Sequence, residues 1–253
     1  MSARPVKEPL SRERVLAAAV AVADAHGIGA VTMRRVAEEL DCEAMSLYHH
    51  VSDKKSLLSG MVETVLVEAV EASLAIQDAA AWRDAVRDRS LAARHVMLAH
   101  PWAPGLVSAE TESPFALYAL YEQFVATLIN AGFTYELAHR AIHALGPLIL
   151  GFTNELFEPD AGDSGAPSEE EMAAIAETMP HIAQLAAMEL HESEGSLGVC
   201  DTQAEFEFTL ALVLDGLEAR RKVAARAATA TATATAATAT ATAATDTATA
   251  TNS

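Results

Sequence analysis

Residues 31–51 read VTMRRVAEELDCEAMSLYHHV, and this stretch decides how the N-terminal part of the chain folds. Thr32 is a suitable N-cap for a short helix over 33–40, because its hydroxyl can accept hydrogen bonds from the free N–H groups of the first turn. Residues 41–43 then predict a tight turn, and residues 44–50 predict a second short helix. Two short helices joined by such a turn have the proportions of a helix-turn-helix motif.

Longer helices are predicted on both sides of this motif. Residues 11–26 place apolar side chains along one helical face, and Gly27 follows as a natural left-handed helix end. Ser52 or Asp53 caps a further helix that is predicted to run to about Gln77. The motif is therefore framed by a helix before it and a long helix after it.

The rest of the chain is predicted to be helical as well. Its pattern favours helices over residues 80–99, 114–131, 134–157, 169–191 and 202–224, and no stretch alternates as a strand would. Residues 227–253 contain only Ala, Thr, Asp, Asn and Ser, so we expect a disordered tail there. The predicted fold class is all-α, with a three-helix helix-turn-helix domain at 1–60 and a helical body at 61–226.

The net charge of −18 is distributed unevenly. Residues 1–60 contain 8 of the 17 basic and 8 of the 35 acidic side chains, so their charges balance. The remaining residues hold 9 basic and 27 acidic side chains and carry the whole net charge. Such a body repels phosphate groups, whereas the N-terminal part can present basic side chains to them.

Composition argues against several classes of protein. Two cysteines leave no disulfide framework and no Cys-x-x-Cys zinc ribbon, which favours a reducing compartment. Residues 1–10 carry three charged side chains and no apolar stretch, so no signal peptide is expected. No uncharged apolar run reaches about 18 residues outside the Ala/Thr tail, so no membrane span or membrane partner is expected. The sequence therefore predicts a cytoplasmic protein.

Residues 12–60 resemble the DNA-binding domain of the tetracycline-repressor (TetR) family. The resemblance is carried by the segments 15–19, 26–28, 31–37, 47–51 and 54–58. Two patterns in them are specific, Thr-x-Arg-x-x-Ala from Thr32 and Leu-Tyr-x-His-Val-x-x-Lys from Leu47. The body is similar to the tetracycline-repressor branch at Trp82, at 131–133, at 150–151 and at Glu155.

The resemblance implies DNA contacts at the matching positions. Contacts to phosphate or base edges are implied for Thr32, Arg34 and Arg35. A place in the major groove is implied for Ala44, Met45 and Ser46, and phosphate contacts are implied for Tyr48, His50 and Lys54. His49 could touch a base or the backbone. The alternatives are solvated charges for the arginines, packing for Tyr48 and helix capping for His50.

One position departs from the family pattern. Asp41 stands in the turn where the family usually has Gly. Asp tolerates the left-handed region of the backbone better than most residues, so we expect the turn to survive with some strain.

Members of this family usually release DNA when a small molecule binds inside the helical body. The resemblance therefore implies an effector pocket in residues 61–226, formed where polar side chains lie among apolar ones. The candidate contacts are Arg89, His95, His100, Trp102, Gln123, Phe124, His139, Ile142, His143 and Glu155. A core or surface role is the alternative for each. Tetracycline is not the expected effector, because the helix-end His that its magnesium site needs is not found near Val107, and no cofactor or bound metal is expected.

The resemblance also implies a homodimer built from the helices at 134–157 and 202–224. Their own patterns agree with this, since each carries a broad apolar stripe. The stripes comprise Ala141, Leu145, Leu148, Ile149 and Phe152 on the first helix, and Phe206, Leu210, Val213, Leu214 and Leu217 on the second. Burial inside a single subunit is the alternative. A two-fold dimer would place two recognition helices about 34–36 Å apart on a palindromic operator.

The function implied is a ligand-responsive, DNA-binding transcriptional repressor rather than an enzyme. One alternative is a DNA-binding protein without an effector, which predicts no pocket in the body. The other is a helical metal-dependent enzyme, because His139 and His143 have the i, i+4 spacing of two metal ligands. No HExxH, GxSxG or phosphate-binding Gly loop accompanies them, so the enzyme is not expected.

Overall fold

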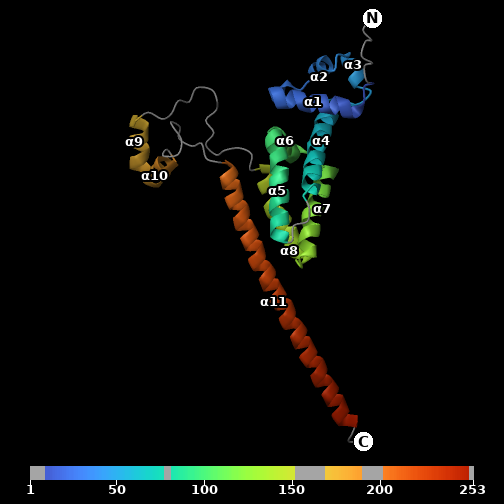
Figure 1. Ribbon diagram of the computed structural model, residues 1–253, viewed down its shortest axis with the longest axis vertical. Helices are drawn as coiled ribbons and strands as arrows, with labels where there is room; N and C mark the ends of the chain where they lie inside the picture. Colours follow the sequence, from blue (N-terminus) through green and yellow to red (C-terminus); the bar gives the residue numbers. More distant parts are fainter. Residues whose placement is uncertain (1–8, 77–80, 152–168, 190–201, 251–253) are drawn as a thin grey trace.

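The structure, a computed structural model, describes residues 9–76, 81–151, 169–189 and 202–250. In these ranges the chain forms eleven α-helices and one short 3-10 helix, with no strand, so the predicted all-α fold class is confirmed. Figure 1 shows a small N-terminal head on one end of a helical body, and a long C-terminal helix that runs along the body and beyond it.

The head consists of α1 (Arg12–His26), η1 (Ile28–Ala30), α2 (Met33–Glu39) and α3 (Ala44–Leu47). Ser11 caps α1, because its hydroxyl accepts the N–H of Arg14 at 3.3 Å. Gly27 ends α1 with a φ of 76°, which favours glycine. The helices close over a fully buried core of Val15, Ala19, Val31, Val36 and Leu47.

The turn between α2 and α3 has the conformation that the sequence predicted. Asp41 lies in the left-handed region with a φ of 48°, and the N–H of Cys42 donates to the carbonyl of Ala37 at 3.0 Å. The second helix of the motif is shorter than predicted. It ends at Leu47, after which the N–H of His50 donates to the Leu47 carbonyl at 2.9 Å in a single tight turn.

Helix α4 (Lys54–Leu74) joins the head to the body without a break. Asp53 caps it by accepting the N–H of Ser56 at 2.7 Å. Its head-side residues pack on α1, and the rest of it packs on α5 (Trp82–Ala99), α6 (Ala103–Ala109) and α7 (Phe115–Asn130). Residue 60, the predicted domain boundary, thus lies inside one continuous helix.

The body is completed by α8 (Tyr135–Gly151) and by the first part of α11 (Thr202–Ala250). The apolar stripes predicted for a dimer contact lie instead mostly inside the subunit. Ala141, Leu145, Leu148 and Ile149 of α8 are buried in the single chain, as are Phe206, Leu210, Leu214 and Leu217 of α11. Phe152 lies outside the described residues. The two stripes are faces of helices that pack against each other within one chain. This is the alternative of burial inside a single subunit.

In two places in the body the helices differ from the prediction. No helix was predicted between 80–99 and 114–131, yet α6 forms there, because Pro104 lies in its first turn, where proline is tolerated. A single helix over 169–191 was expected, but the chain forms α9 (Glu169–Thr178) and α10 (Pro180–Glu189). Pro180 disfavours helical backbone at Met179, so the first helix ends there.

The Ala/Thr tail was predicted to be disordered, whereas α11 continues as helix to Ala250. The alanines of the tail explain the helix, because Ala has the highest helix propensity of all residues. The hydroxyls of Thr229, Thr231 and Thr233 donate to the carbonyls four residues earlier at 2.9–3.0 Å. No helix among the described residues is both long enough and apolar enough to cross a membrane.

Candidate functional site

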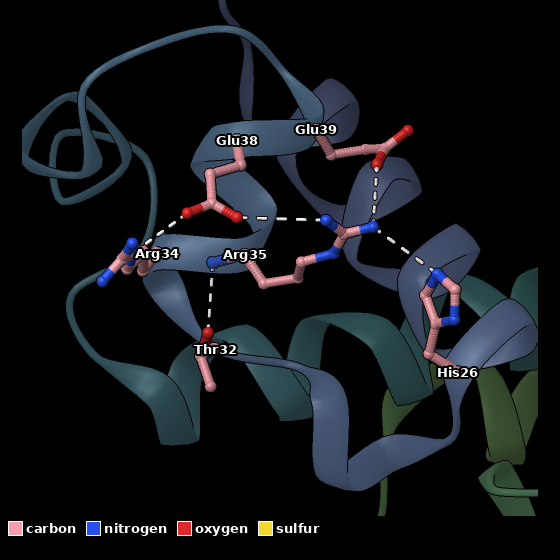
Figure 2. Close-up of polar contacts among 6 residues, drawn as sticks. All are labelled: His26, Thr32, Arg34, Arg35, Glu38 and Glu39. Atoms are coloured by element: carbon pink, nitrogen blue, oxygen red, sulfur yellow. Dashed lines mark hydrogen bonds and ion pairs between the residues drawn. The ribbon is translucent and has the colours of Figure 1, made fainter.

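The first candidate contact, Thr32, caps α2 as predicted. Its Oγ1 accepts the backbone N–H of Arg35 at 3.1 Å, as Figure 2 shows. The hydroxyl is exposed at the end of the helix and keeps its own proton for a further acceptor.

The two arginines of α2 are held by carboxylates on the same helix. Arg34 Nε donates to Glu38 Oε1 at 2.9 Å, while its side chain remains 88% exposed. Arg35 lies between Glu38 and Glu39, with its terminal nitrogens 3.9 and 3.8 Å from their oxygens. Its second terminal nitrogen also lies 3.5 Å from His26 Nε2 of α1. Figure 2 shows Glu38 between the two guanidinium groups.

These ion pairs are exposed and therefore weak, about 0–1 kcal/mol each. A phosphate group can replace a carboxylate on either guanidinium at little cost, and two of its oxygens can accept two parallel hydrogen bonds. Glu38 thus competes with phosphate groups for both arginines.

Helix α3 divides into a buried anchor and an exposed surface. Leu47 is fully buried and fixes the helix in the head. Met45 is 72% exposed, and Tyr48 and His49 are exposed beside it. Ser46 and His50 are half-buried, as is Ala44, which packs on the core of the head. A short helix with small, polar and aromatic side chains outside can enter a DNA groove.

Lys54 is the first residue of α4 and is exposed. The first turn of a helix presents free N–H groups and the positive end of the helix dipole, both of which favour an anion. Nine of the ten predicted DNA contacts therefore lie between the N-cap of α2 and the turn after α3. The tenth, Lys54, begins α4.

The body contains a pocket of about 550 Å³ between the C-terminal end of α4, the start of α5 and the end of α7. Among the predicted ligand contacts that the structure describes, Arg89 and Gln123 alone line it. Arg89 donates to the carbonyl of Ser73 at 2.8 Å and lies 3.5 Å from Gln123 Oε1. Gln123 in turn donates to the carbonyl of Val70 at 3.3 Å.

Eight of the pocket's ten lining residues were not predicted as contacts, among them Trp82, Thr127 and Asn130. A signal for two of them was present. Thr127 and Asn130 follow Gln123 at i+4 and i+7, so they share its face of α7.

His100 and Trp102 do not line this pocket. They lie at the corner between α5 and α6, where both contact Asp24 of α1. The prediction that they belong to one ligand site with Arg89 is therefore not supported by the arrangement of the chain.

The other predicted ligand contacts are scattered. Phe124 is buried in the core, Ile142 packs against it, and His95 is exposed on α5. His139 and His143 are exposed on α8 with their ring centres 4.6 Å apart. No cluster of three metal-binding side chains occurs within the described ranges. Glu155 lies outside the described residues.

A shallow groove of about 540 Å³ runs between α8 and α11. Its walls combine apolar side chains, such as Leu137 and Val213, with Glu136, Arg140 and Arg220. Beside it α11 exposes Phe208 and Leu212, which are 62% and 56% exposed. This is an apolar surface of the isolated chain on the two helices expected at a dimer contact.

Comparison with known proteins agrees with this architecture. Residues 15–61 match the family model "Bacterial regulatory proteins, tetR family", and residues 77–221 match the model "Tetracyclin repressor-like, C-terminal domain". An HTH-type transcriptional regulator of Saccharopolyspora erythraea is 33% identical over 127 residues, which span 50% of this chain and 52% of that protein.

Two further relatives match over most of their length. The tetracycline repressor protein class C of Escherichia coli is 28% identical over 84% of this chain and 92% of its own. A crystal structure of a possible TetR family transcriptional regulator from Streptomyces coelicolor A3(2) is 28% identical, with a TM-score of 0.64 over 83% of this chain and 99% of that one. The matched domains together span the head and most of the body. The protein therefore belongs to the tetR family of bacterial regulatory proteins and is a DNA-binding transcriptional regulator.

Proposed function

We propose that the protein represses transcription in the cytoplasm by binding a palindromic operator as a homodimer, and that a small molecule in the body releases it. The observation that carries this proposal is the surface of the head. In the head and at its junction with α4, Arg34 and Lys54 are exposed and Arg35 is half-buried, on a chain whose remaining residues are strongly acidic. Phosphates are therefore attracted to this surface and repelled by the body.

The DNA contacts divide into two kinds. Arg34, Tyr48 and Lys54 would bind phosphates, which position the head without reading sequence. Met45 and Ser46 would face base edges in the major groove, where hydrogen bonds and apolar contacts discriminate between base pairs. In a homodimer the second head would make the same contacts about one DNA turn away.

The effector site in this proposal is the pocket beside Arg89 and Gln123. Leu74, at the end of α4, lines the same pocket, and Lys54 begins that helix at the DNA-binding surface. A ligand that displaces the end of α4 would therefore tilt the helix and change the separation of the two heads. A coupling of about 1–3 kcal/mol would weaken DNA binding roughly 5- to 150-fold.

The walls of the pocket indicate the kind of effector. Arg89 and the amide groups of Gln123 and Asn130 bind hydrogen-bond acceptors, and the Trp82 indole offers an aromatic face. A flat molecule with carbonyl or carboxylate groups has this chemistry. The position of this pocket at the end of α4, the helix that begins at the DNA-binding surface, supports the ligand-responsive function.

The test is fluorescence anisotropy of the full chain on a labelled fragment from upstream of its own gene, with random DNA as the control, over a salt series. We expect binding that is tighter than to random DNA and that is lost in an Arg34→Ala/Tyr48→Ala double variant. A folded double variant that binds as tightly as the wild type would refute the assignment of the DNA surface.

A further inference from the structure

Helix α8 carries two histidines side by side on its exposed face. His139 and His143 are about one helical turn apart, and their ring centres lie 4.6 Å from one another with the ring planes inclined by 72°. Both side chains are exposed. Residues at i and i+4 of a helix lie on the same face, so the backbone itself holds the two imidazoles together.

The distance between the two rings fits two ligands of one metal ion. Metal–nitrogen bonds of about 2.0–2.1 Å that meet at about 90–109° place the centres of two ligating imidazoles about 4.5–5.2 Å apart. The 4.6 Å between the rings of His139 and His143 falls in this range. The rings thus already have the spacing of a chelate, and exposed side chains can turn one nitrogen of each ring toward the ion.

The ring nitrogens are not engaged elsewhere in the subunit. Within the part of the chain that the structure describes, neither His139 nor His143 forms a hydrogen bond or an ion pair. The charged neighbours on the same helix, Glu136 and Arg140, are paired with each other at 2.8 Å. Imidazole nitrogen is the commonest metal ligand in proteins. Both histidines therefore have their metal-binding atoms available.

The charge of the subunit favours a cation at this surface. Residues 61–253 hold 27 acidic and 9 basic side chains, so the body attracts positive ions. Imidazole ligands suit Zn²⁺, Cu²⁺ and Ni²⁺, whereas Mg²⁺ and Ca²⁺ prefer oxygen ligands. The negative body thus attracts divalent cations in general, and the two nitrogens select a transition metal ion among them.

Two protein ligands make a binding site and not a catalytic one. Catalytic zinc sites have three protein ligands, and no cluster of three metal-binding side chains occurs in the described ranges. Water molecules would complete the coordination of an ion at His139 and His143. The site therefore differs from the metal-dependent enzyme that the spacing offered as an alternative.

We propose that His139 and His143 chelate one divalent transition metal ion per subunit, with Cu²⁺ held more tightly than Ni²⁺ or Zn²⁺. This order follows the general affinity series of nitrogen sites. The site adjoins the groove between α8 and α11, because Glu136 and Arg140 line that groove. It requires neither DNA nor the pocket beside Arg89, so its test does not depend on the proposed function.

Isothermal titration of the full chain with NiCl₂ measures the site, without a histidine tag and at about pH 7.5, where free histidine is mostly neutral. We expect one ion per subunit, tighter binding of CuCl₂, and no displacement of Ni²⁺ by an equal concentration of Mg²⁺. His139→Gln and His143→Gln should each weaken Ni²⁺ binding at least about 100-fold, because the second imidazole of a linked pair binds intramolecularly. His95→Gln, at an exposed position of α5, should leave binding unchanged.

A rescue variant separates chelation from a change in folding. Tyr135 is 75% exposed and lies four residues before His139, so Tyr135→His added to His143→Gln rebuilds an i, i+4 pair and should restore Ni²⁺ binding. Ala144→His added to His143→Gln keeps the number of histidines but moves the second ring about 100° around the helix. This variant should not restore binding.

Four results would overturn the metal site. They are no Ni²⁺ binding by the wild type, unchanged binding after His139→Gln, equal rescue by Ala144→His and Tyr135→His, and displacement of Ni²⁺ by Mg²⁺. Half an ion per subunit would also contradict the proposal, because the ion would then be shared between two copies of the chain.

Discussion

Leu16 of α1 and Gly60 of α4 lie so close that a β-carbon at position 60 would come within 2.6 Å of Leu16 Cδ2. The head is packed onto α4 at this crossing, immediately below the DNA-binding surface. Gly60 is buried in the interior of a helix, where glycine is unfavourable by itself. Its presence is explained by the close approach of the two helices.

We expect Gly60→Ala to destabilise the protein. Overpacking of a core costs about 1–3 kcal/mol, against a gain of about 1 kcal/mol in helix propensity. The net loss of up to about 2 kcal/mol should lower the melting temperature by a few degrees, at about 2–4 °C per kcal/mol.

Gly105→Ala is the matched control, because an added β-carbon in α6 meets no atom within 4 Å. That variant should gain up to about 1 kcal/mol. Equal melting temperatures for the two variants would contradict the close crossing at Gly60.

Glu38→Gln should tighten binding to DNA of any sequence. The substitution removes the carboxylate that holds both Arg34 and Arg35, so phosphates no longer compete with it. Exposed pairs are worth about 0.2–1 kcal/mol, which corresponds to roughly 1.5- to 5-fold in affinity. Glu136→Gln, which breaks the similar exposed pair with Arg140 on α8, should leave DNA affinity unchanged in the same anisotropy assay.

Lys54→Ala should weaken binding to all sequences and reduce the slope of log affinity against log salt by about one. With one phosphate contact fewer, DNA binding releases about one counterion fewer. Lys222→Ala removes a lysine of α11 that pairs with Glu218 and serves as the control. A salt slope that is the same for Lys54→Ala and the wild type would exclude a phosphate contact at this position.

Glu218→Gln should flatten the stability of the protein in acid. Hydrogen bonds from Arg221 lower the pKa of Glu218 to about 2. Because the folded pKa is below the ordinary value of 4.5, the stabilising effect is complete above that value and is lost as pH falls through about 2. Arg221 also donates to the Ala131 carbonyl at 3.2 Å, so this pair ties α11 to the turn between α7 and α8.

The measurement is the urea midpoint between about pH 2 and 6. The wild type should lose stability over this range by more than Glu218→Gln does. Glu205→Gln, at an exposed position of the same helix, should follow the wild type. Parallel curves for all three proteins would contradict the role of Glu218.

Phe208→Ser together with Leu212→Ser should weaken the homodimer and leave the subunit folded. Both side chains are exposed in the single chain and follow one another at i, i+4 on α11. Burying them against a second copy would contribute about 1.5–3 kcal/mol each per subunit. Sedimentation equilibrium measures the loss, with Leu98→Ser on α5 as the control, and an unchanged dimer would place the interface elsewhere.

Most of the head was predicted from the sequence, because its signals are local, although the helix predicted over 44–50 ends at Leu47 and the 3-10 helix at Ile28–Ala30 was not expected. Ser11 and Thr32 cap helices through neighbouring N–H groups, Gly27 ends a helix by its own backbone freedom, and Asp41 turns the chain within three residues. Errors in the body came from local signals that were misread. Pro104 lies in the first turn of α6, where proline is tolerated, and the alanines of the Ala/Thr repeat favour helix strongly enough to offset the weaker propensity of threonine.

The sequence could not distinguish the residues that line the pocket from the residues that join the head to the body. His100 and Arg89 are both nearly buried polar side chains on one helix or at its end, and no pattern in the sequence tells them apart. Tertiary packing brings Arg89 to Gln123 of α7, 34 residues away, and brings His100 to Asp24 of α1, 76 residues away. The sequence by itself determined the helices, the DNA-binding motif and the family, because these depend on neighbours along the chain. Which side chains share a pocket, and which of them hold the head to the body, was decided by the packing of α4 against α1, α5 and α7.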